Sequence, residues 1–246
     1  MTLSGEEAKR YARHIVLKGV GGQGQQRLKS SKVLIIGAGG LGSPIIAYLA
    51  GAGVGTIGIV DNDVISLSNL QRQVIHTTNG VGVSKVKSAK DFALSLNPEI
   101  KINIYNERIK RENAKQIIAD YDIVVDGCDS FETRLVVSDA AQEEKKYLVA
   151  GGVSMFDGHV SVFAPFLKNK NDKYNPKFKD LYPDVPTNAK LPACEETGVI
   201  GAVTGVIGTL MAMEVIKVIV GLGDPLIGRL LLYDGSSAKF SEIKYG

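Results

Sequence analysis

The chain has 246 residues, of which 44% are hydrophobic and 22% charged, with a formal net charge of +3. This composition is typical of a folded globular protein, and the charge gives no argument for a nucleic-acid or membrane partner. Cys128 and Cys194 are too few for a disulfide framework or a four-thiolate zinc site. The charged N-terminus lacks the apolar core of a signal peptide, so we expect a cytoplasmic protein.

Residues 1–28 are expected to form a helical lead-in to the domain. The glycine run from Gly19 to Gly24 predicts a break in this lead-in, after which a short helix resumes at Gln25. Taken alone, Arg13 is interpreted as a solvated charge on a helix.

Residues 33–42 predict a strand followed by a phosphate-binding turn. The run VLII at 33–36 is continuously apolar, as in a parallel strand buried on both faces. The next residues fit GxGxxG and include both Gly39 and Gly40, where the backbone can approach a phosphate closely. The helix that follows would point its free N–H groups and its positive dipole end at that phosphate.

A second strand at 56–60 ends at Asp61, where a carboxylate can accept hydrogen bonds from a ribose. The polar stretch 64–82 follows, and loops at the carboxyl ends of parallel strands bind ligands in such folds. We predict that the polar residues of this region contribute to a nucleotide site: Asp61, Asp63, Asn69, Arg72 and Gln73. Arg72 suits a triphosphate because arginine binds phosphate oxygens with two parallel hydrogen bonds, although each residue alone would more often be a surface residue.

Residues 84–96 predict a helix with Ser84 as its cap. Lys85 in the first turn opposes the helix dipole, which indicates that its charge has another partner, such as a phosphate. The alternation then continues with strands at 100–105, 123–125 and 147–150 and helices at 112–119 and 133–144.

The strand at 123–125 is followed by Asp126 and Asp129, and carboxylates at the end of a core strand are costly unless they are paired or bind a cation. Asp129 suits a Mg²⁺ ion beside a nucleotide, since Mg²⁺ takes one or two carboxylates together with phosphates. The alternative, that Asp129 caps the helix beginning near Phe131, is equally consistent with the sequence. Cys128 is interpreted as a small buried residue.

After a strand at 158–164, residues 165–192 show no period and are rich in proline and lysine. We expect a crossover loop there, because a stretch of this length without a period is usually functional or mobile. Cys194 follows near the start of a helix, where a structural and a reactive thiol are equally consistent with its position. The apolar stretch 199–222 contains Glu214 and Lys217, so we interpret it as a core or subunit-interface helix and not as a membrane span.

Residues 230–234 and 238–244 predict a hairpin that closes the sheet. Together the elements predict one domain over 1–246, an α/β Rossmann-like fold of three layers with a mostly parallel central sheet and antiparallel strands at its C-terminal end. A nicotinamide oxidoreductase would explain the glycine turn and Asp61, but Arg72, Lys85 and Asp129 together favour ATP with Mg²⁺.

Several motifs in order resemble the ThiF/MoeB/HesA family, the bacterial relatives of ubiquitin-activating enzymes: RYARHIVL, GAGGLGSPIIAYLAGAGVGTIGIVDND, SLSNLQRQ, DGCDSFETR, CEETGVIGAVTGVIGTLMAMEVIK and LLLYDG. The resemblance covers Arg10 to the C-terminus. It implies that MgATP is used to adenylate the C-terminal glycine of a ubiquitin-like sulfur carrier of the ThiS or MoaD type, for thiamine or molybdopterin biosynthesis. A tRNA-modifying cyclase-dehydratase of the same superfamily is the related alternative.

The resemblance also implies roles for individual residues. Gly39 and Gly40 match the turn that receives the phosphates, and Asp61 matches the residue that holds the ribose. The residues that contact the triphosphate correspond to Asn69, Arg72 and Lys85. The Mg²⁺ ligand corresponds to Asp129. Arg13 resembles an arginine that reaches across a homodimer into the partner's nucleotide site, which replaces its interpretation as a solvated charge.

Cys194 matches a family cysteine that forms a covalent link to the carrier in some members and is dispensable in others. Many members bind structural zinc through two CxxC pairs, and neither pair is present in this sequence, so we predict no zinc. Ser130 stands where an asparagine usually follows the aspartate, which predicts a slightly different geometry for Mg²⁺ at Asp129.

Overall fold

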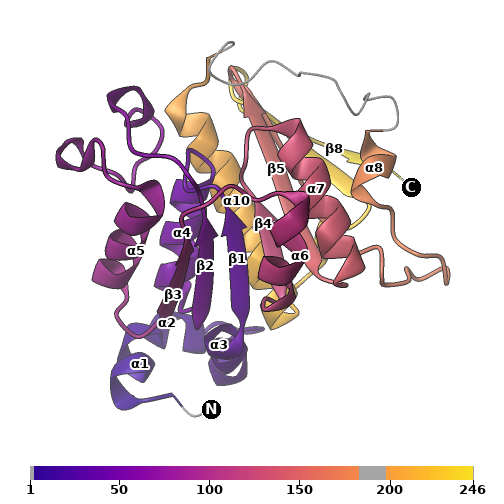
Figure 1. Cartoon of the computed structure of the whole chain (residues 1–246). Helices are drawn as coiled ribbons and strands as arrows, with labels where there is room; N and C mark the ends of the chain where they lie inside the picture. The colour runs from indigo at the N-terminus through magenta and orange to yellow at the C-terminus, as the bar shows by residue number, and fades with distance from the viewer. Residues whose placement is uncertain (1–2, 183–197, 246) are drawn as a thin grey trace.

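The computed structural model describes residues 3–182 and 198–245. Within these residues, one eight-stranded sheet has the order β3-β2-β1-β4-β5-β6-β7-β8 (Figure 1). Its strands are β1 (Lys32–Ile36), β2 (Thr56–Val60), β3 (Lys101–Tyr105), β4 (Ile123–Asp126), β5 (Tyr147–Ser154), β6 (Asp157–Phe163), β7 (Arg229–Asp234) and β8 (Lys239–Lys244). The first five pair in parallel and the last three antiparallel, which confirms the predicted α/β sheet.

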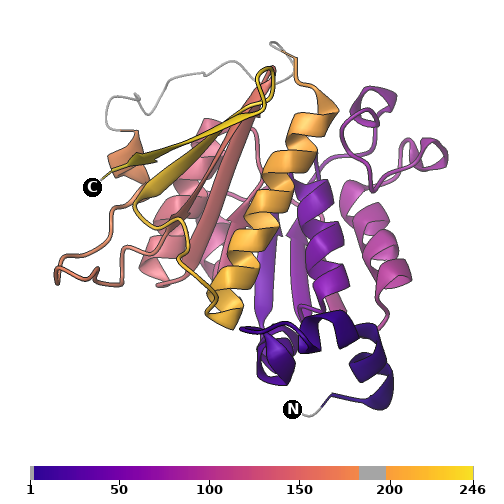
Figure 2. The same ribbon diagram turned by 180° about the vertical axis from the view of Figure 1, so that it is seen from behind.

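Helices cover both faces of the sheet, as the two opposite views show (Figure 1, Figure 2). One layer contains α4 (Gly42–Ala52), α5 (Lys85–Leu96) and α10 (Gly201–Val220), and the other contains α6 (Arg111–Ala119), α7 (Phe131–Glu143) and α8 (Phe178–Leu181). The apolar run of β1 serves both layers, because Val33 and Ile35 pack in one core and Leu34 and Ile36 in the other.

The N-terminal lead-in consists of α1 (Gly5–Arg10), α2 (Ala12–Ile15) and α3 (Gly21–Ser30). The predicted break at the glycine run is wrong in extent, because α3 already begins at Gly21 and includes Gly24. A Cβ at Gly24 would lie 3.0 Å from side-chain atoms of Val20 and Val220. Glycine at this position therefore allows α3 to pack closely against the end of α10, and this packing offsets the low helix propensity of glycine.

By length and composition α10 could cross a membrane, but half of its most apolar window is buried in this fold. It packs across β5 and β6 and along α4. Its buried Glu214 is fully engaged, pairing with Lys217 at 2.6 Å and accepting the backbone N–H of Leu226 at 2.8 Å. These contacts confirm the interpretation of the apolar stretch as a core helix.

A stability prediction concerns Gly58 in the middle of β2, where a Cβ would collide with the buried Tyr121 ring and approach Leu34 to 2.8 Å. Gly58→Ala should therefore lower the free energy of unfolding by about 1–3 kcal/mol, the usual range for overpacking. Gly205→Ala in α10 is the control, because a Cβ there meets nothing within 4 Å and alanine favours helix. Equal urea midpoints for the two variants would contradict the packing described for β2.

Candidate functional site

A cavity of about 700 Å³ opens at the carboxyl ends of the parallel strands, beside the point where the strand order reverses between β1 and β4. Such crevices are where open α/β sheets bind ligands. Every residue that the sequence assigns to the nucleotide lines this cavity: Gly39, Gly40, Asp61, Asp63, Asn69, Arg72, Gln73, Lys85 and Asp129.

The glycine turn between β1 and α4 forms the floor of the cavity. Gly37 has a φ of +94°, which favours glycine, and a Cβ at Gly40 would lie 3.1 Å from Thr204 on α10. Gly39 differs, because its added Cβ would meet only Gln73 Nε2 at the ordinary distance of 3.6 Å. Packing within the protein therefore explains Gly37 and Gly40, whereas the bare backbone of Gly39 leaves room for a ligand.

The turn also presents unpaired backbone donors. Among the described residues, no acceptor is found for the N–H groups of Gly39, Gly40 and Leu41, and α4 has no side-chain cap. Free N–H groups at the start of a helix attract anions through hydrogen bonds and through the helix dipole. This part of the cavity is therefore suited to a phosphate group.

Asp61 is half-buried at the end of β2 and faces the turn. Its Oδ2 accepts the N–H of Ala38 at 2.8 Å, and its Oδ1 accepts the N–H of Asp63 at 2.9 Å. Burial raises the pKa of Asp61, while these two hydrogen bonds and the charge of Lys85 oppose the increase. Each carboxylate oxygen keeps a further lone pair, so the group can also accept hydrogen bonds from a ribose.

The loop after β2 brings three side chains with unused hydrogen-bonding capacity to the cavity. Asn69 Oδ1 accepts the N–H of Ser66 at 3.3 Å, while its amide N–H₂ has no partner in the described part of the chain. Arg72 donates to a backbone carbonyl but has no carboxylate partner within the described ranges. The buried Oε1 of Gln73 also lacks a partner there. A polar ligand in the cavity would satisfy these groups.

Lys85 begins α5 and is almost fully buried, and its Nζ lies 2.8 Å from Oδ2 of the exposed Asp63. The sequence predicts a charged partner for Lys85, because its position in the first turn of a helix opposes the helix dipole. Asp63 is such a partner. An ammonium group has three N–H donors, and Asp63 accepts one of them within the described part of the chain. Ser84 is the N-cap residue of α5, as predicted, although its Oγ donates to Asn106 Oδ1 and makes no capping hydrogen bond to the helix.

Asp129 is exposed on the loop between β4 and α7. The alternative role as a helix cap is wrong, because the cap of α7 is Ser130, whose Oγ accepts the N–H of Thr133 at 3.4 Å. No cluster of three or more His, Cys, Asp or Glu side chains suited to a metal occurs within 3–182 and 198–245. A lone exposed carboxylate still fits Mg²⁺ bound to ATP, since that ion takes most of its ligands from phosphates and water.

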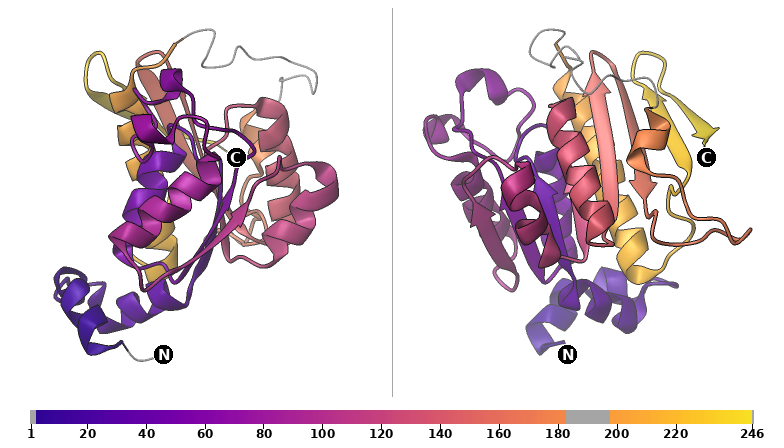
Figure 3. Two further views of the ribbon diagram at one scale, coloured as in Figure 1. Left: turned by 60° about the vertical axis from the view of Figure 1, so that its left-hand side comes forward. Right: turned by 45° about the vertical axis from the view of Figure 1, so that its right-hand side comes forward.

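Arg13 is not among the residues that line the cavity. Arg13 is exposed on α2, and Figure 3 shows this helix at the end of the molecule opposite the loops that follow β1, β2 and β4. It therefore does not contribute to the cavity of its own chain. Cys194 lies outside the described residues.

Cys128 is half-buried beside the cavity. Its Sγ donates to Asp126 Oδ1 at 2.8 Å, and burial raises the pKa of this thiol well above its usual value. A thiol held in its neutral form is a poor nucleophile. The structure thus agrees with the interpretation of Cys128 as a small buried residue.

Further cavity residues had no role in the sequence interpretation. The half-buried Arg134 donates to the carbonyls of Cys128 at 2.6 Å and Gly151 at 2.7 Å, and so ties the loop after β4 to β5. His159 Nε2 on β6 lies 3.2 Å from the hydroxyl of Tyr182, and burial lowers the pKa of His159 to about 4. These contacts join separate elements, so no local pattern indicates them.

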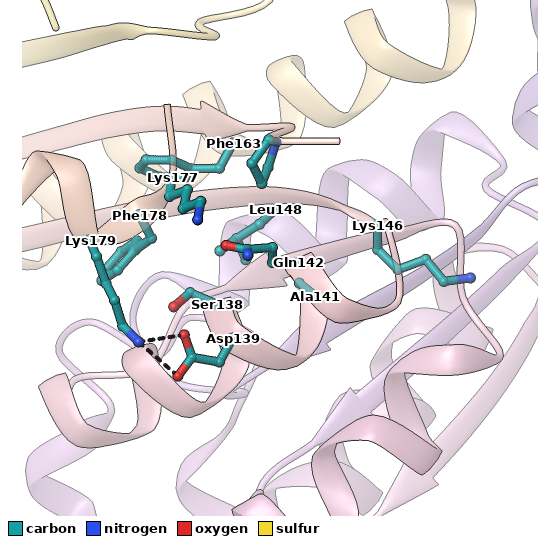
Figure 4. Close-up of a pocket in the computed structure, with 11 residues that line it drawn as sticks. Ser138, Asp139, Ala141, Gln142, Lys146, Leu148, Phe163, Lys177, Phe178 and Lys179 are labelled. Atoms are coloured by element: carbon teal, nitrogen blue, oxygen red, sulfur yellow. Dashed lines mark hydrogen bonds and ion pairs between the residues drawn. The ribbon is translucent and has the colours of Figure 1, made fainter. Parts of the chain in front are cut away.

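Tyr182 is held at the cavity by α8, which lies within the predicted crossover loop 165–192. Phe178 is buried against the rings of Phe131 and Phe163, and Lys179 pairs with Asp139 of α7 at 2.8 Å (Figure 4). The hollow drawn there between α7 and α8 has a volume of about 10 Å³, enough for roughly one water molecule. Residues 178–182 of the crossover loop are therefore held by packing, while residues 183–192 are outside the described ranges.

Comparison with known proteins agrees with this geometry. The model of the ThiF family matches residues 11–246, nearly the whole chain. The chain belongs to the ThiF family. This finding confirms the resemblance in the sequence motifs.

The relatives are named as adenylyltransferases. The chain is 45% identical over 241 residues to a probable adenylyltransferase/sulfurtransferase MoeZ of Mycobacterium tuberculosis, covering 98% of this chain and 61% of that protein. It is 44% identical to a sulfur carrier protein adenylyltransferase of Thermus thermophilus, covering 97% and 87%. A probable molybdopterin-synthase adenylyltransferase of Porphyra purpurea is 43% identical, with coverage of 99% and 62%. The chain thus spans about three fifths of the MoeZ and Porphyra proteins.

Among solved structures, that of PaaA superposes with a TM-score of 0.80 at 25% identity, covering 100% of this chain and 76% of that chain. E. coli MccB gives a TM-score of 0.82 at 22% identity, covering 99% and 71%. These similarities confirm the Rossmann-like fold with its C-terminal antiparallel strands.

The environment of His159 predicts a pH dependence of stability. Its pKa falls from 6.5 to about 4 on folding, so the unfolded chain binds more protons between these values and the free energy of unfolding decreases as pH falls through this window. His159→Gln should lose less stability than wild type between pH 7 and pH 5 in urea titrations. Tyr182→Phe is the control and should keep the wild-type pH dependence, since burial is the main cause of the shift. Identical pH profiles for wild type and His159→Gln would contradict this assignment.

Proposed function

We propose that this protein is a MgATP-dependent adenylyltransferase that activates the C-terminal glycine carboxylate of a ubiquitin-like sulfur-carrier protein. The observation that carries the proposal is one cavity lined both by a glycine turn, whose N–H groups at 39–41 have no acceptor among the described residues, and by the cationic side chains of Arg72 and Lys85. Membership of the ThiF family and the names of the relatives support the same reaction.

In this proposal different residues of the cavity bind different parts of the nucleotide. The turn at Gly39 and Gly40 accepts the phosphates, and Asp61 accepts hydrogen bonds from the ribose. The side chains that contact the triphosphate are Asn69, Arg72, Gln73 and Lys85, with Asp63 holding Lys85 in place. Asp129 holds Mg²⁺, which neutralises phosphate charge when it is bound.

The chemical step needs little from the protein beyond position and charge. A carboxylate oxygen of the carrier attacks the α-phosphorus in line, the bond to the β,γ-phosphates breaks, and acyl-adenylate and pyrophosphate result. The carboxylate is already ionised at pH 7, so no general base is required. Arg72 and Lys85 stabilise the charge that develops on the phosphate oxygens and the leaving group.

We further propose that the protein acts as a homodimer. The exposed Arg13 does not line the cavity of its own chain, and in this proposal it contributes to the nucleotide site of a second copy, as the family resemblance implies. Adenylation itself does not require a thiol, and Cys194 would act only in a later covalent step with the carrier. The carrier is of the ThiS or MoaD type, serving thiamine or molybdopterin biosynthesis.

The test is ATP–pyrophosphate exchange in the presence of a carrier that ends in Gly-Gly. Exchange should depend on the carrier. Arg72→Ala and Asp129→Ala should each reduce it to background, because the first removes a cation that balances the triphosphate and the second removes the carboxylate proposed to hold Mg²⁺. Lys170→Ala, an exposed lysine outside the cavity, should retain the wild-type rate.

Near-normal exchange in Arg72→Ala or Asp129→Ala would contradict the site assignment. Absence of exchange with every ThiS- or MoaD-type carrier would contradict the function. Tight NAD binding that ATP does not displace would instead indicate an oxidoreductase, and dependence on tRNA would indicate a cyclase-dehydratase.

A further inference from the structure

Ala38, at the centre of the glycine turn, is held through both of its backbone polar groups. The N–H of Ala38 donates to Asp61 Oδ2 at 2.8 Å, and the carbonyl of Ala38 lies 2.9 Å from Nε2 of His76. Ala38 itself is fully buried, whereas its neighbour Gly39 lines the cavity. The orientation of the turn therefore depends on a histidine that does not line the cavity.

The two hydrogen bonds of His76 determine its tautomer. The side chain is only 6% exposed, and its Nδ1 lies 2.9 Å from Ser88 Oγ. A carbonyl oxygen can only accept, so Nε2 carries the proton and Nδ1 accepts the hydroxyl of Ser88. Burial lowers the pKa of His76, which keeps the ring in this neutral form.

The geometry of a peptide bond transmits this contact to the cavity. No peptide bond of the described chain is cis, and in a planar trans peptide the C=O and the following N–H point in opposite directions. The Ala38 carbonyl is directed at His76, so the N–H of Gly39 is directed away from it. That N–H has no acceptor among the residues described and belongs to the turn that faces the cavity.

His76 also connects the segments that carry the other ligand-binding groups. It belongs to the loop that contains Arg72 and Gln73, and Ser88 lies one turn after Lys85 on α5. The ring thus joins the glycine turn, the loop after β2 and the first turns of α5. A shift of any one of these segments would strain a contact of His76.

We propose that His76 is a positioning residue for phosphate binding, which fixes the Ala38–Gly39 peptide so that the Gly39 N–H is presented to the phosphates of ATP. This inference rests on the proposed function only in the identity of the ligand. His76 does not touch the nucleotide and acts through the backbone of the turn. A substitution that removes the hydrogen bond from Nε2 to the Ala38 carbonyl should therefore weaken ATP binding more than it lowers the stability of the fold.

A pair of substitutions separates the two hydrogen bonds. In His76→Gln the amide nitrogen can occupy the Nε2 position and donate to Ala38, whereas in His76→Asn the shorter side chain reaches only the Ser88 side. The dissociation constant of MgATP, measured by isothermal titration calorimetry, should rise roughly three- to tenfold in His76→Asn, as expected for one lost hydrogen bond. It should stay within about twofold of wild type in His76→Gln, since the positioning bond is retained. Ser88→Ala, which keeps the bond to Ala38, is the matched control and should behave as His76→Gln does.

Thermal unfolding without nucleotide supplies the second readout. A purely structural role would lower the midpoint in both His76 variants and leave their ATP affinities alike, and that result would overturn the proposal. Should His76→Asn not fold, ¹⁵N NMR of the wild-type imidazole decides: a proton on Nδ1 would overturn the proposal and a proton on Nε2 would support it. ATP that fails to bind even wild type would instead contradict the proposed function, so the two failures are distinguishable.

Discussion

The pairing of β1 with β2 on one side and β4 on the other is the constraint on which the site depends. In this register Ile36 lies opposite both Val60 and Asp126, so the three strands end at the same level. The loops that follow must then meet above the same edge of the sheet. That convergence brings together the glycine turn, Asp61 and Asp129, which are far apart in the chain. β1 lies at the centre of this arrangement, because its apolar side chains are buried in cores on both faces of the sheet.

The charge and hydrogen-bond balance of the cavity explains why a polyanion fits it. Among the described residues, the N–H groups at 39–41 have no acceptor and the guanidinium of Arg72 has no carboxylate partner, so both favour negative charge, as do the remaining donors of Lys85. The carboxylates are arranged differently: Asp61 is engaged by backbone N–H groups and Asp63 by Lys85, whereas Asp129 is exposed. The contacts of Arg134 and His76 hold the loops that carry these groups.

Much of this arrangement follows from local sequence patterns, and what does not follow depends on contacts between distant segments. Asp61 and Lys85 are predictable because they lie at the ends of recognisable strands and helices, and Arg72 because it lies in the polar loop between them, at the edge of a parallel sheet that binds ligands. His76 gives no local signal, because its partner Ala38 is 38 residues away. The same reason applies to His159 with Tyr182 and to Gly24, which packs on the end of α10. That Ser130 and not Asp129 caps α7 follows from the structure alone.

The central claim is that this cavity transfers AMP to a protein carboxylate. Intact-mass spectrometry of a Gly-Gly-ending carrier after incubation with wild-type protein and MgATP tests it most directly. We predict a carrier species heavier by one adenylyl group, which is absent when the terminal glycine is deleted or when ATP is replaced by NAD. A carrier that stays unmodified, although the protein binds both it and MgATP, would contradict the account.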